Sequence, residues 1–136
     1  MAKLGILQKL TWAIALVSAC ATPVMGAPSL DSVRHALGGT SQSVDDTRFE
    51  RELDPDGTAT DRYEGDSSAA HGRWLVFQSD APPREAKGHK LSPGDYYLEI
   101  QENGDVLLFV LKELSSQSLS LVYLERGNTI SFTRLK

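Results

Sequence analysis

The feature that most constrains the fold of this chain is the dipeptide Asn103-Gly104, which stands between two apolar runs. The runs cover residues 96–101 and 106–111, and each has the length of a β-strand. Asn-Gly in this setting is the strongest short signal for a tight β-hairpin, because both residues accept the positive φ angles of the turn. Residues 106–111 are apolar on both faces, which predicts a central strand that is buried on both sides.

A second hairpin and three earlier strands extend this pattern along the chain. Residues 119–124 are expected to pair with residues 129–135 across a turn in which Gly127 suits a bulge. Alternation in the last run predicts that Ile130 and Phe132 face inward. The earlier strands are predicted at residues 48–53, 58–63 and 73–78.

The turn between the first two of these strands is specified by Asp54-Pro55-Asp56-Gly57. Proline presets the φ angle of one turn position, aspartate bonds its own backbone, and glycine accepts a positive φ angle. Seven short strands joined in this way predict a mainly β fold, an antiparallel meander that closes into a small barrel or sandwich. In the fourth strand, Tyr96 is expected to point inward with Leu98, and Tyr97 outward.

The segment before the strands is predicted to hold one short helix over residues 29–39. Ser29 can cap its start, and Gly38 is placed to end it. Leu30, Val33 and Leu37 form a narrow apolar stripe, so the helix is expected to lie on another part of the fold. Residues 40–46 are polar and are predicted to be a flexible connection.

Residues 1–26 have the pattern of a secretory signal peptide. Lys3 and Lys9 make a basic start, residues 10–21 carry no charge, and small residues precede a cleavage site before Ala27. The apolar run is shorter than the roughly 20 residues of a permanent membrane span. The mature protein is therefore expected to be secreted or periplasmic.

A second processing route remains open. Leu16-Val17-Ser18-Ala19-Cys20 resembles a bacterial lipoprotein box, in which the signal ends at residue 19 and the cysteine is lipidated. Lipidation of Cys20 would anchor the protein to an envelope membrane, and the chain is expected to meet a membrane only in that case.

Cleavage after Gly26 would leave 12 basic and 18 acidic residues, and so a net charge of −6. The acidic balance argues against nucleic acid and anionic membranes as partners and allows a basic one. The mature chain would contain no cysteine, so a core without disulfides must stabilise it. Its length fits a helix and connection at residues 27–46 and a single β domain at residues 47–136.

Three short motifs resemble those of small lipocalin-like domains in bacterial exported proteins. They are Asp56-Gly57-Thr58, Gly72-Arg73-Trp74 and Ile130-Ser131-Phe132-Thr133-Arg134. In lipocalins, a Gly-x-Trp motif opens the first barrel strand, and an arginine of the last strand packs over its tryptophan. The resemblance implies that Trp74 and Arg134 form such a pair, and that the barrel carries a small apolar ligand.

No catalytic motif stands out, so the chain is expected to be non-enzymatic and to need no cofactor. It contains neither a Gly-x-Ser-x-Gly elbow nor a glycine-rich phosphate loop, and its histidines lack metal-ligand spacing. Asp54, Asp56 and Asp61 could supply oxygen ligands to calcium, although an EF-hand spacing is missing. The favoured interpretation of this segment is a solvated turn whose aspartates bond to the backbone.

The long connection at residues 80–94 is the main candidate for binding, because loops on rigid β scaffolds commonly carry function. It is predicted to contain no regular element, and it holds Arg84, Lys87, His89 and Lys90. Trp74 and Tyr97 are further candidates, as aromatic residues that could line a ligand mouth. The predicted function is that of a small exported protein that binds another protein in the envelope or outside the cell, as inhibitors, immunity proteins and host-directed factors do. A lipocalin-like carrier is the alternative.

Overall fold

The computed structural model of the chain describes residues 27–135. The expected signal peptide, both cleavage sites and Cys20 lie outside the described residues. Within residues 27–135, no helix has both the length and the apolar character that a bilayer span requires.

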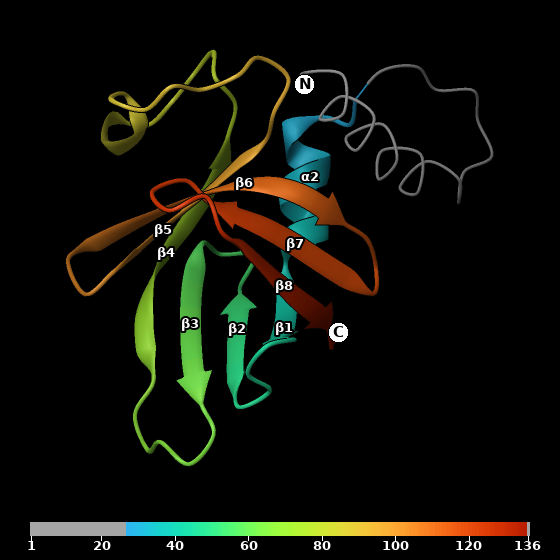
Figure 1. Cartoon of the computed structure of the whole chain (residues 1–136), viewed down its shortest axis with the longest axis vertical. Helices are drawn as coiled ribbons and strands as arrows, with labels where there is room; N and C mark the ends of the chain where they lie inside the picture. Colours follow the sequence, from blue (N-terminus) through green and yellow to red (C-terminus); the bar gives the residue numbers. More distant parts are fainter. Residues whose placement is uncertain (1–26, 136) are drawn as a thin grey trace.

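Eight antiparallel strands form a closed barrel in which each strand pairs with its neighbours in the sequence, and the last strand pairs with the first (Figure 1). The strands are β1 (Gly39–Ser43), β2 (Phe49–Leu53), β3 (Thr58–Tyr63), β4 (Ala70–Phe77), β5 (Tyr97–Glu102), β6 (Asp105–Leu114), β7 (Ser118–Tyr123) and β8 (Thr129–Arg134). Helix α2 (Leu30–Leu37) precedes them, and the 3-10 helix η1 (Arg84–Ala86) lies between β4 and β5.

The predicted mainly β, antiparallel fold is confirmed, but the predicted number of strands is one short. Strand β1 lies where a flexible connection was expected, and it pairs with both β2 and β8. Its sequence contains only glycine and small or polar side chains, and the buried positions are Ser41 and Ser43. Such a segment has no apolar alternation, so its strand conformation depends on the two neighbours that it joins when the barrel closes.

The predicted turns have the expected backbone conformations. Asn103 and Gly104 have φ angles of 55° and 81°, as the two-residue hairpin requires. In the turn before β3, Gly57 has a φ of 96°, and the Asp54 carboxylate accepts the amide hydrogen of Asp56 at 3.1 Å.

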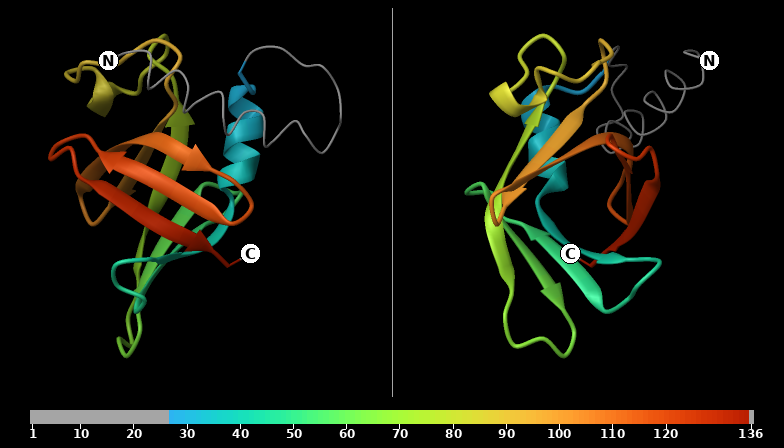
Figure 2. Two further views of the ribbon diagram at one scale, coloured as in Figure 1. Left: turned by 45° about the vertical axis from the view of Figure 1, so that its right-hand side comes forward. Right: turned by 60° about the vertical axis from the view of Figure 1, so that its left-hand side comes forward.

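Helix α2 lies at one end of the barrel, where it contacts β4 (Figure 2). The Ser29 side chain accepts the amide hydrogen of Ser32, as an N-cap does, and Val33 and Leu37 are buried in the barrel core. At the other terminus, Arg134 of β8 donates to the carbonyls of Leu37 and Gly38. A cation at this position satisfies free carbonyls and favours the negative end of the helix dipole.

The pairing of Trp74 with Arg134 that the lipocalin resemblance implied is replaced by a different contact. The guanidinium over the Trp74 ring belongs to Arg34 of α2, 4.7 Å from the ring centroid. The indole nitrogen of Trp74 donates to the carbonyl of Asp54 at 2.8 Å. Arg134 instead donates to carbonyls at the end of the helix. Arg34 therefore has the position over Trp74 that the resemblance assigned to Arg134.

Two apolar clusters lie on opposite faces of the sheet. The main cluster fills the barrel and includes Leu98, Ile100 and Phe132. The second cluster lies outside it, where Phe77, Ala86, Tyr97 and Leu108 are buried together. These clusters confirm the prediction that residues 106–111 are buried on both faces, and that Tyr97 points outward. The connection between β4 and β5 covers this outer cluster. It was predicted to contain no regular element, but it contains the 3-10 helix η1.

Candidate functional site at the barrel mouth

We call the end of the barrel opposite α2 the mouth. The connections from β1 to β2, β3 to β4, β5 to β6 and β7 to β8 surround it. Two hollows meet there along the β3–β4 loop, and both are lined by Arg62, Tyr63, Asp66, Ser68 and Ala69.

The mouth hollow has a volume of about 380 Å³, and its lining includes the buried residue Asp61. Its wall combines the rings of Phe49 and Tyr63, whose centroids are 5.5 Å apart, with two carboxylates, Asp61 and Glu102. Ala70 and Asn103 complete its lining, together with the shared residues of the β3–β4 loop.

A buried ion pair forms the floor of this end. Arg51 of β2 and Asp61 of β3 are direct partners in the sheet, and both side chains point inward. The Arg51 Nε and Nη2 groups donate to the two Asp61 carboxylate oxygens at 2.8 and 2.9 Å. Three rings, those of Phe49, Phe109 and Phe132, lie within 5.4–5.9 Å of the guanidinium carbon. The opposite charges of Arg51 and Asp61 compensate each other, so the pair forms a polar layer without net charge in the barrel interior.

Glu102 of β5 lies beside this pair and has an unusual ionisation. Its Oε2 atom is buried and has no hydrogen-bond partner among residues 27–135. Burial, followed by the negative charge of Asp61, raises the pKa of Glu102 from 4.5 to about 7, although Arg51 opposes the shift. Glu102 can therefore hold a proton near neutral pH at the edge of the mouth hollow.

The raised pKa of Glu102 predicts a change in stability with pH. A group whose pKa is raised on folding stabilises the fold fully below its unfolded pKa, and this contribution is lost as the pH rises to about 7. We expect Glu102→Gln to match the wild type near pH 4 and to exceed its free energy of unfolding near pH 8 by roughly 1 kcal/mol, a value that allows for solvent screening. Urea denaturation across this range measures the difference. A constant difference at every pH would contradict the assignment.

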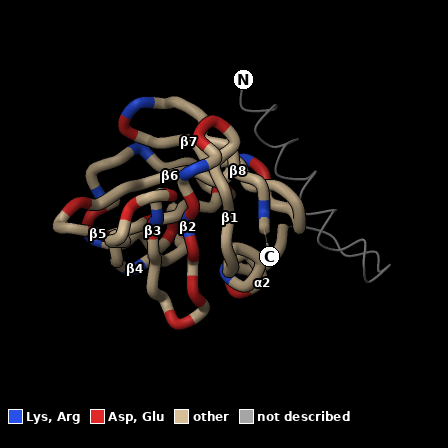
Figure 3. Tube along the Cα trace, turned by 90° about the horizontal axis from the view of Figure 1, so that it is seen from below, with Lys and Arg blue, Asp and Glu red and all other residues tan. Residues whose placement is uncertain are grey.

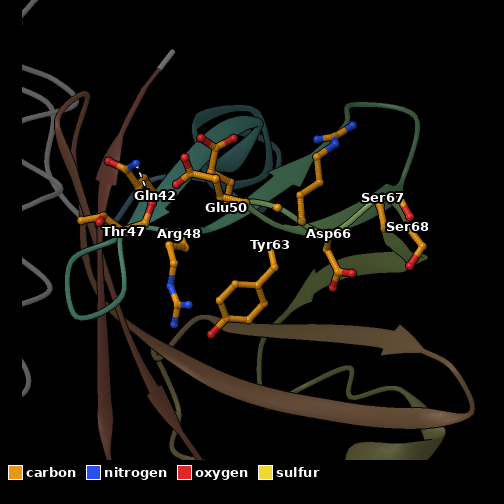
Figure 4. A pocket seen from close by; sticks show the side chains of 12 residues that line it. Gln42, Thr47, Arg48, Glu50, Tyr63, Asp66, Ser67 and Ser68 are labelled. Carbon is orange, nitrogen blue, oxygen red and sulfur yellow. Dashed lines mark hydrogen bonds between the residues drawn. The ribbon is translucent and has the colours of Figure 1, made fainter.

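The side hollow has a volume of about 630 Å³ and lies against the outer faces of β2 and β3 (Figure 4). Arg48 and Tyr63 extend side by side at its edge, with the guanidinium carbon 5.5 Å from the ring centroid. The Tyr63 hydroxyl donates to Asp46 at 2.7 Å. Hydrogen bonds from Arg48 and then from Tyr63 lower the pKa of Asp46 to about 2, so this carboxylate stays charged across the neutral range.

Acidic side chains outnumber basic ones around the mouth. Figure 3 shows acidic segments on β2 and on turns of this end. The exposed or half-buried acids here are Asp45, Asp46, Glu50, Glu64, Asp66, Glu102, Asp105 and Glu125, against Arg48, Arg62 and Arg126. A concave surface on which negative charges prevail raises the local concentration of positively charged groups from solution.

The structure places two of the binding residues predicted from sequence in the interior. Trp74 is 4% exposed beneath α2, and Tyr97 is 2% exposed beneath the β4–β5 connection, stacked on Phe77 at 5.3 Å. They lie in different clusters on opposite faces of the sheet. They therefore contribute to packing and offer little surface to a partner.

The four basic residues of the predicted binding loop, by contrast, are exposed. Arg84, Lys87, His89 and Lys90 lie on and after η1, while Ala86 between them is buried in the outer cluster. The loop is thus anchored to the barrel with its basic side chains outward, away from the mouth. They form a second surface that is available to a partner.

The calcium candidates are not brought together. Asp54 and Asp56 lie in the β2–β3 turn at the end near α2, where their carboxylates accept backbone amide hydrogens. Asp61 points into the barrel and pairs with Arg51. Across residues 27–135, no group of three or more histidine, cysteine or acidic side chains is arranged to hold a metal ion. The turn interpretation of this segment accounts for Asp54 and Asp56.

Comparisons of the chain with protein-family models, curated proteins and solved structures found no match. The geometry and charge of the described residues are therefore the grounds for a functional proposal.

Proposed function

We propose that this chain is a small exported, non-enzymatic protein that binds another protein through the barrel mouth. The surface consists of the mouth hollow and the side hollow, with the β3–β4 loop as the ridge between them. Its chemistry suits a basic segment of the partner, with arginine or lysine side chains entering the hollows.

The observation that carries this proposal is that the protein's own side chains occupy the barrel interior. A carrier needs an internal cavity of roughly 300 Å³ or more with apolar walls. Here buried side chains from β2 to β8 form one contiguous apolar cluster, the buried residues of β1 are Ser41 and Ser43, and the ion pair of Arg51 with Asp61 lies near the mouth. The two hollows lie at the surface and are rimmed by polar groups. A lipocalin-like carrier would need the space that these side chains occupy.

Charge complementarity selects the kind of partner. The acids around the mouth are mostly exposed, so a basic partner meets little desolvation cost at the rim while its approach is accelerated electrostatically. Tyr63 is 44% exposed on the ridge, and it supplies an aromatic face on which an arginine or lysine can stack.

Charge reversal tests this proposal with matched variants. Glu64→Lys combined with Asp66→Lys changes the ridge, and Asp80→Lys combined with Glu113→Lys makes the same change of charge at exposed sites elsewhere. Proteins that the wild type captures from an envelope or extracellular extract are identified and purified, and their Kd for each variant is measured by calorimetry. We expect the ridge variant to bind at least about tenfold more weakly, and the control variant to bind like the wild type.

A third variant, Lys87→Glu combined with Lys90→Glu, distinguishes the mouth from the basic loop. Unchanged binding by this variant supports the mouth. Loss of binding in the loop variant alone, or an equal loss in the ridge and control variants, would contradict the proposal.

A further inference from the structure

Residues 78–95 of the connection between β4 and β5 are built as a unit of their own, whereas Tyr96, which follows them, belongs to the barrel core and its carbonyl accepts the amide hydrogen of Leu111 on β6. The backbone hydrogen bonds of this unit join residues within the connection, as in Ala81 to Gln78, Ala86 to Pro83, His89 to Ala86 and Asp95 to Ser92. Gly94 adopts a φ of 84° shortly before β5 begins. A segment with internal hydrogen bonding can leave the barrel surface without breaking them.

Contacts with the outer face of the barrel hold this unit in place. Ala86 is fully buried in the outer cluster, and Leu91 packs against the same cluster. The surface beneath contains Phe77, Tyr97 and Leu108. The polar contacts across the interface include a hydrogen bond in which the amide of Ser92 donates to the Tyr97 hydroxyl at 2.8 Å. The closed position therefore depends mainly on apolar contacts.

A carboxyl group is enclosed on the same outer face. Glu99 lies two residues after Tyr97 on β5 and is 1% exposed. Its Oε1 accepts a hydrogen bond from the Gln101 amide at 3.2 Å, whereas its Oε2 is buried and has no hydrogen-bond partner among the described residues. Its partners across the sheet are the apolar side chains Leu75 and Leu108.

The charged group that the connection brings toward Glu99 is another acid. Glu85 of η1 acts on Glu99 by charge repulsion. The guanidinium of Arg84, 3.9 Å from the Glu85 carboxylate, is 90% exposed and compensates for that charge only in part. A buried carboxylate without a cationic partner is costly, and the neutral acid is the form that this environment tolerates.

We propose that residues 78–95 form a pH-responsive flap that closes over β5 when Glu99 is protonated and opens when Glu99 ionises. Opening would uncover Phe77, Tyr97 and Leu108, which in the closed form are sealed from solvent. The flap is separate from the mouth, and this proposal does not depend on the proposed function.

The direction of the pH effect follows from linkage. Burial raises the pKa of Glu99 in the closed form above its ordinary value of 4.5, and Glu85 adds to the rise. The closed form is therefore fully favoured below the ordinary glutamate pKa. Above that pH, the equilibrium constant for closing falls by up to about tenfold per pH unit. The fall ends when the pH reaches the raised pKa of Glu99 in the closed form.

Hydrogen exchange with mass spectrometry tests the flap. Exchange of peptides from residues 78–95 is followed from about pH 4 to about pH 9 in the wild type and in Glu99→Gln, and the ratio of the two rates cancels the intrinsic pH dependence of exchange. We expect Glu99→Gln to remain closed, so the ratio should rise by up to about tenfold per pH unit across the window. Trp74, in the other cluster, reports by fluorescence that the barrel itself stays folded.

Glu85→Gln is the matched variant on the flap. It removes the repulsion, so the pKa of Glu99 in the closed form should be less raised, and opening should level off at a lower pH with a smaller amplitude. A ratio that stays constant with pH would overturn the proposal, as would opening of Glu99→Gln in parallel with the wild type. A change in Trp74 fluorescence at the same pH as the change in exchange would also overturn it, because the event would then be global unfolding.

Discussion

Replacement of Arg51 by methionine is expected to lower the free energy of unfolding by about 3–5 kcal/mol. Methionine is of similar length and apolar, so the substitution removes the charge and the hydrogen bonds while filling much of the volume. The Asp61 carboxylate, 8% exposed, would then remain in the barrel without the two bonds that now satisfy its oxygens. Denaturation by urea, followed by Trp74 fluorescence, measures the loss.

A double variant separates the cost of an unpaired charge from the value of the pair. In Arg51→Met combined with Asp61→Leu, both charges are gone and the layer between Phe49, Phe109 and Phe132 becomes apolar. Apolar replacements of buried ion pairs are often neutral or stabilising, so the double variant should be clearly more stable than Arg51→Met. Equal losses in the two variants would contradict the buried pair.

Gly72→Ala is expected to destabilise the barrel by about 3 kcal/mol, near the upper end of what overpacking usually costs. A Cβ atom at this position would lie 1.9 Å from the carbonyl oxygen of Gln101 and 2.7 Å from the Cβ of Glu102. The nearest obstacle is backbone of the paired strand β5, which cannot turn away as a side chain can. Relief would require β4 and β5 to separate where Gly72 pairs with Glu102.

Gly88→Ala is the matched control for this variant, because nothing lies within 4 Å of a Cβ built at Gly88. We expect its free energy of unfolding to change by no more than about 0.5 kcal/mol. Comparable destabilisation of the two alanine variants would show that the close approach of β4 and β5 at Gly72 is not limiting.

The sequence places Arg51 on the inner face of its strand but does not fix its partner. Arg51 stands three residues before the predicted Asp54–Gly57 turn and Asp61 stands four residues after it, and Arg51 shares its face with Phe49 and Leu53. A symmetric hairpin around that four-residue turn would place Arg51 opposite Thr60, whereas the structure has one more residue in the turn, so that Arg51 pairs with Asp61. Glu102 could not be found in this way, because it reaches the pair only when β5, distant in the sequence, closes onto β4.

The strand that the sequence did not reveal shows the same limit. Strands β5 and β6 carry enough apolar alternation to specify themselves, and their turn is specified by Asn103 and Gly104. Strand β1 carries no such pattern, and its hydrogen bonds are supplied by β2 on one side and β8 on the other.

The residues alone determined the antiparallel hairpins, their turns and the helix start at Ser29, because these depend on preferences of neighbouring residues. Closure into a barrel, the burial of Trp74 and Tyr97 in separate clusters, and the meeting of Glu102 with Asp61 were decided by tertiary structure. The physical reason is that burial and charge contact depend on which distant strands become neighbours, and alternation along one strand does not carry that information.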